Sequence, residues 1–128
     1  MLLHLRTRVA AIMAKSHLAM LATCGPADIQ AGVYPCEADG MRLYMLVPRT
    51  SDHLYNVEIS PDVVVTTHRW QARGKARVLA PEAAPRALLL DAREEAQWSV
   101  VLEIVPARLQ IAAENDGPYV ETIDVDGE

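Results

Sequence analysis

The sequence predicts a mainly β protein, an antiparallel β-barrel with helices at its periphery. Apolar runs of strand length are joined by short turns, and β-branched residues fill several of these runs. No alternating strand–helix–strand pattern runs through the chain, which excludes a doubly wound parallel sheet and leaves an antiparallel barrel. The 128 residues suit a single domain spanning residues 1–128, and the hydrophobic fraction of 51% supports a packed core.

Each element is predicted from its local pattern. Apolar residues recur at three- and four-residue steps at the start of the chain, which indicates a helix. Strands follow on either side of the turn sequences Gly-Pro-Ala-Asp and Ala-Asp-Gly. Thr50 or Ser51 can cap a short helix that ends at Ser60-Pro61. The other expected elements are a first helix over 2–16, strands over 17–23, 29–37, 41–47, 63–67 and 71–79, a helix over 81–95 and a long strand over 99–113.

Three residues should interrupt or end strands. Pro48 is expected to end the third strand, because proline cannot donate to a ladder of hydrogen bonds. Gly74 is expected at a β-bulge or a close backbone approach, and Pro106 at a strand edge or at a bend where the last strand turns a barrel corner. The acidic end of the chain, ETIDVDGE, is expected to be ordered only in part.

Charge and composition narrow the class of function. The net charge of −5, from 17 acidic and 12 basic residues, argues against a nucleic-acid binder. No apolar run reaches the roughly 18 residues that a membrane span needs. Arg6, Arg8 and Lys15 interrupt the first segment, which therefore lacks the apolar core of a signal peptide. A cytoplasmic protein without a membrane partner is expected.

Histidines and cysteines give no sign of a metal or disulfide site. The four histidines show no metal-ligand spacing, so no metal site is expected. Cys24 lies near a predicted turn and Cys36 at the far end of the same hairpin. Their Cα atoms should therefore be more than the roughly 7 Å apart that a disulfide spans. Two free, mostly buried thiols are expected.

After the opening helix the chain contains, in order, the segments HLAMLAT, AGVYPCEADGMRLYMLVP, SDHLYNVEISPDVVV, GKARVL and VVLEIVPARLQI. Their order resembles the pyridoxamine 5′-phosphate oxidase-like family, also called the FMN-binding split barrel, and the resemblance implies an antiparallel split β-barrel. The resemblance covers residues 2–125. It implies a homodimer that holds FMN in a cleft at the subunit interface, and a flavin-dependent oxidoreductase acting on a small-molecule substrate. The alternatives are a binder of deazaflavin or haem, and a non-catalytic dimer that has lost its flavin.

The resemblance also implies a phosphate site where the third strand meets the short helix. This junction commonly reads Ser-Arg-Lys in the family, whereas here it reads Ser51-Asp52-His53. A helix start exposes unpaired N–H groups and a partial positive charge, which together bind anions. Arg49, Thr50, Ser51 and His53 are therefore the candidate phosphate ligands, while Asp52 would oppose an anion unless it points away. The alternative is that Ser51 only caps the helix and that Arg49 is a solvated surface residue.

Further cofactor contacts follow from the same resemblance. Val33 and Val47 lie on the hairpin strands that line the isoalloxazine ring in the family. Trp70 and Gln71 follow a strand at a hairpin turn, where family members often place a residue that reaches the partner's flavin. Trp70 could equally be an exposed tryptophan at a subunit interface, whereas Trp98 is expected to pack in the core. No catalytic side chain stands out, which is compatible with a flavin enzyme because the cofactor performs the electron transfer.

Overall fold

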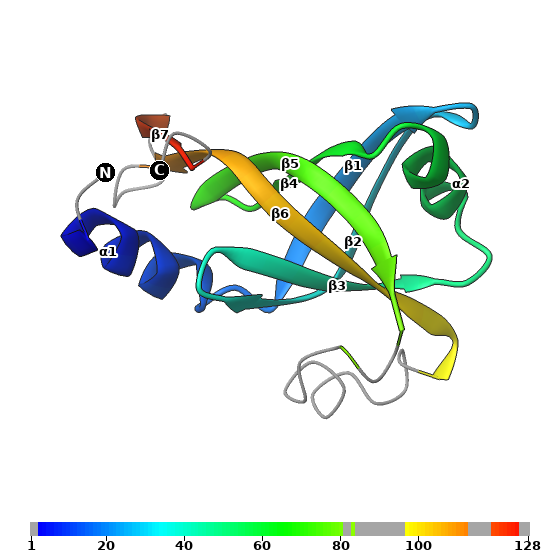
Figure 1. Cartoon of the computed structure of the whole chain (residues 1–128), viewed down its shortest axis with the longest axis horizontal. Helices are drawn as coiled ribbons and strands as arrows, with labels where there is room; N and C mark the ends of the chain where they lie inside the picture. Colours follow the sequence, from blue (N-terminus) through cyan, green and yellow to red (C-terminus); the bar gives the residue numbers. More distant parts are fainter. Residues whose placement is uncertain (1–2, 81–82, 84–96, 113–118, 126–128) are drawn as a thin grey trace.

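The computed structural model describes residues 3–80, 83, 97–112 and 119–125. Helices and strands follow the predicted order, and the two helices lie at opposite ends of the sheet (Figure 1). The helix expected over 81–95 lies, apart from Ala83, outside the described residues. The described elements are α1 (Leu3–Met13), β1 (Leu18–Gly25), β2 (Asp28–Asp39), β3 (Arg42–Pro48), α2 (Asp52–Ile59), β4 (Asp62–Thr66), β5 (Trp70–Leu79), β6 (Ser99–Ala112) and β7 (Tyr119–Asp124).

The strands form one antiparallel sheet that closes on itself. Its order is β3-β2-β1-β4-β5-β6-β7, and an additional pairing between β3 and β6 closes the first six strands into a barrel. The first half of β6 pairs with β3 and β5, whereas its second half pairs with β5 and β7. The prediction of a mainly β split barrel with peripheral helices is confirmed.

Pro106 and Gly74 lie where β6 changes partners. The pairing with β3 ends at Ile104 and the pairing with β7 begins at Arg108, so Pro106 sits in the gap between them. A residue without an N–H group is tolerated in that gap. A Cβ atom on Gly74 would overlap the carbonyl oxygen of Val105, so only glycine allows β5 and β6 to approach this closely. Both predictions about these residues are confirmed.

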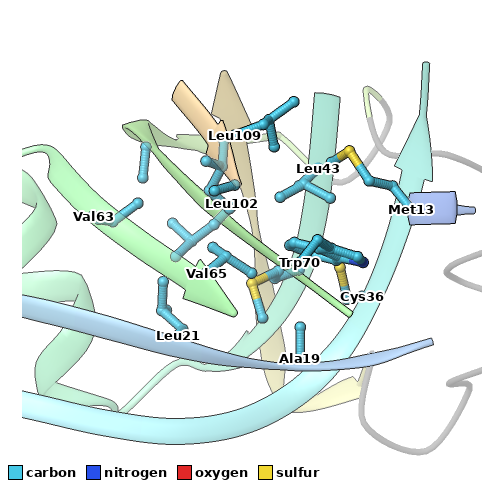
Figure 2. Packing of buried hydrophobic residues seen from close by; sticks show 14 of the residues in the cluster. Met13, Ala19, Leu21, Cys36, Leu43, Val63, Val65, Trp70, Leu102 and Leu109 are labelled. Atoms are coloured by element: carbon cyan, nitrogen blue, oxygen red, sulfur yellow. The ribbon is translucent and has the colours of Figure 1, made fainter. Parts of the chain in front are cut away.

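Along each strand every second residue faces inward, and these side chains fill the barrel. Trp70 is fully buried in this core and donates its indole Nε1–H to Ser16 Oγ at 3.2 Å. Figure 2 shows its ring close to Cys36, Leu43 and Val65. The buried cluster consists of Val9, Met13, Ala19, Leu21, Cys36, Leu43, Met45, Val47, Val57, Val63, Val65, Trp70, Ala72, Ala76, Leu102, Ile104, Leu109, Ile111 and Ile123.

Several predictions about individual residues are wrong. An accessible Trp70 was expected, but the inward alternation of β5 puts it at the centre of the core. Trp98, expected in the core, is 72% exposed because it precedes the first residue of β6. Cys24 faces outward and is exposed, although both cysteines are free as expected. Burial of Cys36, with a smaller contribution from the charge of Glu37, raises the pKa of its thiol to about 12.

Two strand boundaries also differ from the prediction. Pro48 is the last residue of β3 instead of the first residue after it, and it still pairs with Ser99 of β6. The acidic C-terminal segment contributes β7, a strand that was not predicted. Within β7 and just beyond it, Ile123 is buried and Val125 is half-buried, whereas Asp124 between them is exposed. That alternation is the sequence signal for a strand with one covered face.

Candidate functional site

The start of α2 is closed by hydrogen bonds within the chain itself. Ser51 is the N-cap residue, and its Oγ accepts a hydrogen bond from the amide of His53 at 3.1 Å. The amide of Leu54 donates to the Ser51 carbonyl at 3.2 Å, and the amide of Ser51 donates to the Pro48 carbonyl at 3.0 Å. The predicted cap at Ser51 is confirmed. Since these donors are already engaged, few remain to hold a phosphate there.

The side chain of His53 points into the interior of the protein. It is 2% exposed, and its Nδ1 lies 2.7 Å from Thr23 Oγ1 on β1. Asn56 donates from Nδ2 to the same hydroxyl oxygen at 3.1 Å, so the hydroxyl proton is free to go to the imidazole. The Tyr34 ring and the imidazole make a T-shaped contact, with ring centroids 5.4 Å apart and planes at 87°. We call Thr23, Tyr34, His53 and Asn56 the α2 clasp.

Burial sets the charge of His53. Loss of solvent around the imidazole lowers the pKa of His53, and the opposing effect of the Asp52 carboxylate is smaller. A neutral ring can accept the Thr23 hydroxyl proton at Nδ1, since Asn56 donates to the same oxygen and leaves that proton available. In this arrangement His53 is a neutral member of the core, not a cation that faces an anion.

Asn56 connects α2 to the turn between β1 and β2 through two hydrogen bonds. Its Oδ1 accepts a hydrogen bond from the amide of Ala27 at 2.8 Å, and its Nδ2 donates to the carbonyl of Asp28 at 2.9 Å. A Cβ atom on Gly25 would lie 2.9 Å from Asn56 Oδ1, so this packing needs a glycine or a shift of the amide. Asn56 was missed in the sequence. The available signal was its position three residues after His53, on the same face of a short helix.

The other predicted cofactor residues separate into three places. Two of them are exposed beside the start of α2, two lie inside the barrel, and two lie on the outer face of the sheet. The structure therefore does not bring the whole predicted set together. Arg49 and Thr50 are exposed beside Ser51, Val47 and Trp70 are buried in the core, and Val33 and Gln71 lie on the outer face.

A groove of about 540 Å³ lies on the outer face of β1, β4 and β5, with β6 at one end. Its floor is formed by the small residues Ala22 and Val64, which pair with each other across β1 and β4. The row continues through Arg73 on β5 to Arg108 on β6, since Val64 pairs with Arg73 and Arg73 pairs with Arg108. We call this groove, with Ala22, Cys24, Ile29, Val64, Arg73 and Arg108 in its lining, the outer-face trough.

Positive charge gathers at one end of the outer-face trough. Lys75 pairs with Asp62 at 3.3 Å, and Arg108 Nε lies 3.5 Å from Asp124 Oδ1, both on the exposed surface. Arg73 makes no salt bridge with any of the residues that the structure describes. The trough thus combines an apolar floor with a cationic end, although the whole chain carries a net charge of −5.

Exposed apolar side chains lie beside the trough on the same face. Met20 pairs with Val33 across β1 and β2, and Leu18 lies two residues before Met20 on the same side of β1. Leu18 is 61% exposed and Val33 is 57% exposed. A smaller hollow of about 330 Å³ is lined by these three residues, with Thr66 and His68 at its other side. We call Leu18, Met20 and Val33 the apolar patch.

Neither a metal-ligand cluster nor a membrane-spanning helix is found in the described part of the chain. No group of three or more histidine, cysteine, aspartate or glutamate residues within it is placed to hold a metal ion. None of its helices has the length and apolar character that crossing a bilayer requires.

Comparison with known proteins identifies the fold. No protein-family model and no curated protein matches the chain. Among solved structures, a protein from Listeria innocua provisionally assigned as a pyridoxamine 5′-phosphate oxidase is 18% identical, with a TM-score of 0.69 over 84% of this chain and 97% of the other. An F420 reductase is 15% identical, with a TM-score of 0.60 over 77% of this chain and 93% of the other.

A haem-binding protein from Mycobacterium smegmatis extends this comparison. It is 18% identical, with a TM-score of 0.67 over 93% of this chain but only 56% of that longer protein. The chain therefore has the split-barrel fold of the pyridoxamine 5′-phosphate oxidase-like proteins, and the resemblance found in the sequence is confirmed at the level of fold. Proteins with this fold carry names that refer to different small molecules, so the fold alone does not identify the ligand of this chain.

Proposed function

We propose that this chain binds FMN in the outer-face trough, at the interface of a homodimer, and acts as a flavin-dependent oxidoreductase on a small-molecule substrate. The observation that carries the proposal is the trough itself. Its volume of about 540 Å³ falls within the usual range of small-molecule sites, about 300–1,000 Å³. Its floor of Ala22 and Val64 is small and apolar, which suits the face of a flat ring.

A second copy of the chain would cover the apolar patch and close the trough. Leu18, Met20 and Val33 are exposed together on one face of β1 and β2, and contiguous apolar surface of this kind marks an interaction site. Homo-oligomers with twofold symmetry bring the same patch of two subunits together. Val33 belongs to the apolar patch beside the trough and does not line it, and neither do the buried Val47 and Trp70.

The start of α2 fits a phosphate less well than the sequence suggested. Ser51 and His53 are engaged within the chain, and the carboxylate of Asp52 is exposed at the first position of the helix. Arg49 and Thr50 are the two predicted ligands there whose side chains face solvent. When bound, FMN would supply hydride transfer. This chain's part is to hold the ring on the floor of the trough and to exclude water once the dimer forms.

Cofactor titration of the purified full chain tests the proposal. We expect FMN at micromolar concentration to bind with quenched flavin fluorescence, and light scattering to report a dimer. Ala22→Phe fills the floor of the trough and should abolish binding, whereas Ala11→Phe places the same ring on the exposed face of α1 and should not. Failure of the dimer to bind FMN, or unchanged binding by Ala22→Phe, would overturn the proposal.

A dimeric module without a cofactor is the second candidate. The observation in its favour is the α2 clasp, which withdraws His53 from the predicted phosphate site, together with the acidic Asp52 at the same junction. This candidate predicts a colourless dimer whose melting temperature is unchanged by FMN, by the deazaflavin F420 or by haemin. Solved structures of this fold include an F420 reductase and a haem-binding protein, so these two ligands belong in the same titration. A Soret band on adding haemin would indicate an axial ligand.

A further inference from the structure

A β-bulge determines which residue faces Arg73 across the β5–β6 ladder. Gly74 pairs with Pro106, but the next residue of β5, Arg73, pairs with Arg108, so Ala107 is an extra residue of β6. Such an insertion shifts every later side chain of the strand to the opposite face. Without the bulge, Arg108 would point into the core. With it, Arg108 faces outward beside Arg73.

The burial of the residues that follow the bulge agrees with this shift. Leu109 and Ile111 follow the bulge, and both face inward opposite Ala72 and Trp70. The bulge therefore places two apolar residues in the core and the Arg108 guanidinium on the outer face at the same time. Directly opposed side chains on antiparallel strands have Cβ atoms about 4.5–5.5 Å apart, so the two arginines are neighbours.

Two opposed cations on adjacent strands destabilise a sheet unless an anion lies between or beside them. The nearby acids compensate only in part. Asp124 and Asp62 pair with Arg108 and Lys75 on the exposed surface, where ion pairs are weak. Arg73 has no acidic partner among the described residues. Arg73, at the end of the trough, is thus left without a counter-charge among the residues that the structure describes.

We propose that Arg73 and Arg108 form the anion-binding end of the outer-face trough, whose occupant is a flat apolar molecule that carries a phosphate, sulfonate or carboxylate. The inference rests on the proposed function only in taking the trough as the ligand site. Two planar guanidinium groups offer paired donors that match the oxygens of such anions. The floor of Ala22 and Val64 would receive the apolar body. The anion lies at this end instead of at the start of α2, where Asp52 repels it and Ser51 is already bonded.

The test compares ligands that differ only in the anion. Dissociation constants of FMN and riboflavin are measured for the full chain and for Arg73→Gln and Arg108→Gln, with folding checked by circular dichroism. We expect the native chain to prefer FMN. Each variant should lose about tenfold to hundredfold in FMN affinity, because hydrogen bonds to charged groups are worth that much, with riboflavin binding unchanged. Lys15→Gln removes one positive charge at an exposed site near the end of α1 and controls for net charge.

A second pair of probes separates this inference from the flavin proposal. 1-Naphthyl phosphate and 1-naphthol differ in the same way but are not flavins. If the chain binds neither flavin yet prefers naphthyl phosphate in an Arg73-dependent manner, the anion site stands and the flavin proposal falls. If FMN binds and both arginine variants keep the preference, the anion site is overturned, as it is if Arg49→Gln alone removes that preference. A chain that binds none of the four compounds overturns both.

Discussion

Thr23 on β1 and His53 on α2 share a buried hydrogen bond of 2.7 Å between Oγ1 and Nδ1. The two residues are 30 positions apart in sequence, so the bond fixes a long-range relationship between the helix and the barrel. Asn56 completes the arrangement by donating to the same oxygen. The helix start that the sequence assigned to a phosphate is thus held by the protein's own polar groups.

Replacing Thr23 by valine should destabilise the fold. Valine keeps the shape but removes the hydroxyl, which leaves the imidazole of His53 without its donor and Asn56 with one acceptor fewer. A buried polar group left without a partner costs about 1–3 kcal/mol. The free energy of unfolding, from urea denaturation, measures this loss. Thr23→Ser keeps the hydroxyl and loses one methyl group, worth about 0.8 kcal/mol. A serine variant no more stable than the valine variant would argue against the hydrogen bond.

The stability of the chain should fall in mild acid because of His53. Burial lowers the pKa of His53 in the folded state below its ordinary value of 6.5. As the pH drops below 6.5, the unfolded chain takes up a proton that the folded chain resists, and the native state loses stability. The contribution is therefore fully present above pH 6.5 and declines toward the lowered pKa.

Thermal melts between pH 5 and pH 8 measure this effect in the native chain and in His53→Gln. The variant should show a flatter dependence on pH because it lacks the titrating group. The other three histidines are common to both proteins, so the difference between the two curves isolates His53. Parallel curves would show that protonation of His53 is not linked to unfolding.

Much of the barrel could be predicted from local patterns. Turn sequences, β-branched runs and a capping serine act within a few residues, and the structure follows them. Gly74 and Pro106 were also placed correctly, because a missing side chain and a missing N–H group each restrict where a residue can sit in a sheet. The strand β7 was missed since acidic residues obscured a short alternation around Ile123.

The candidate site was harder to predict because it depends on register and on burial. Whether His53 faces a ligand or the core is decided by Thr23 and Asn56, which only the fold brings together. The pairing of Arg73 with Arg108 depends on one extra residue at a bulge. Gly74 indicated where a bulge could lie, but the sequence did not show that the bulge turns Arg108 to the outer face. Long-range pairing, unlike capping, leaves no local signature.

The close approach of β5 and β6 at the bulge can be tested by substituting Gly74. Gly74→Ala introduces a Cβ that overlaps the Val105 carbonyl, so β5 and β6 must move apart. Overpacking of this kind costs about 1–3 kcal/mol in unfolding free energy. Gly40→Asn is the matched control: Gly40 has a φ of 63° and no atom within 4 Å of an added Cβ, and asparagine tolerates that conformation. The control should stay close to native stability, and an alanine variant equally close to it would contradict the close approach.

Arg73→Gln should leave the fold as stable as the native chain or make it more stable. The substitution removes one of two like charges that face each other across β5 and β6, and such opposition costs about 1 kcal/mol or less. Salt screens exposed charges, so any gain measured by urea denaturation at low ionic strength should shrink when salt is added. Arg108→Gln relieves the same repulsion but also removes the ion pair with Asp124, so its net effect should be smaller. A marked loss of stability in Arg73→Gln would show that Arg73 supports the fold itself. Unchanged or increased stability, together with weaker binding of an anionic ligand, would show that the opposed arginines serve ligand recognition at the expense of the sheet.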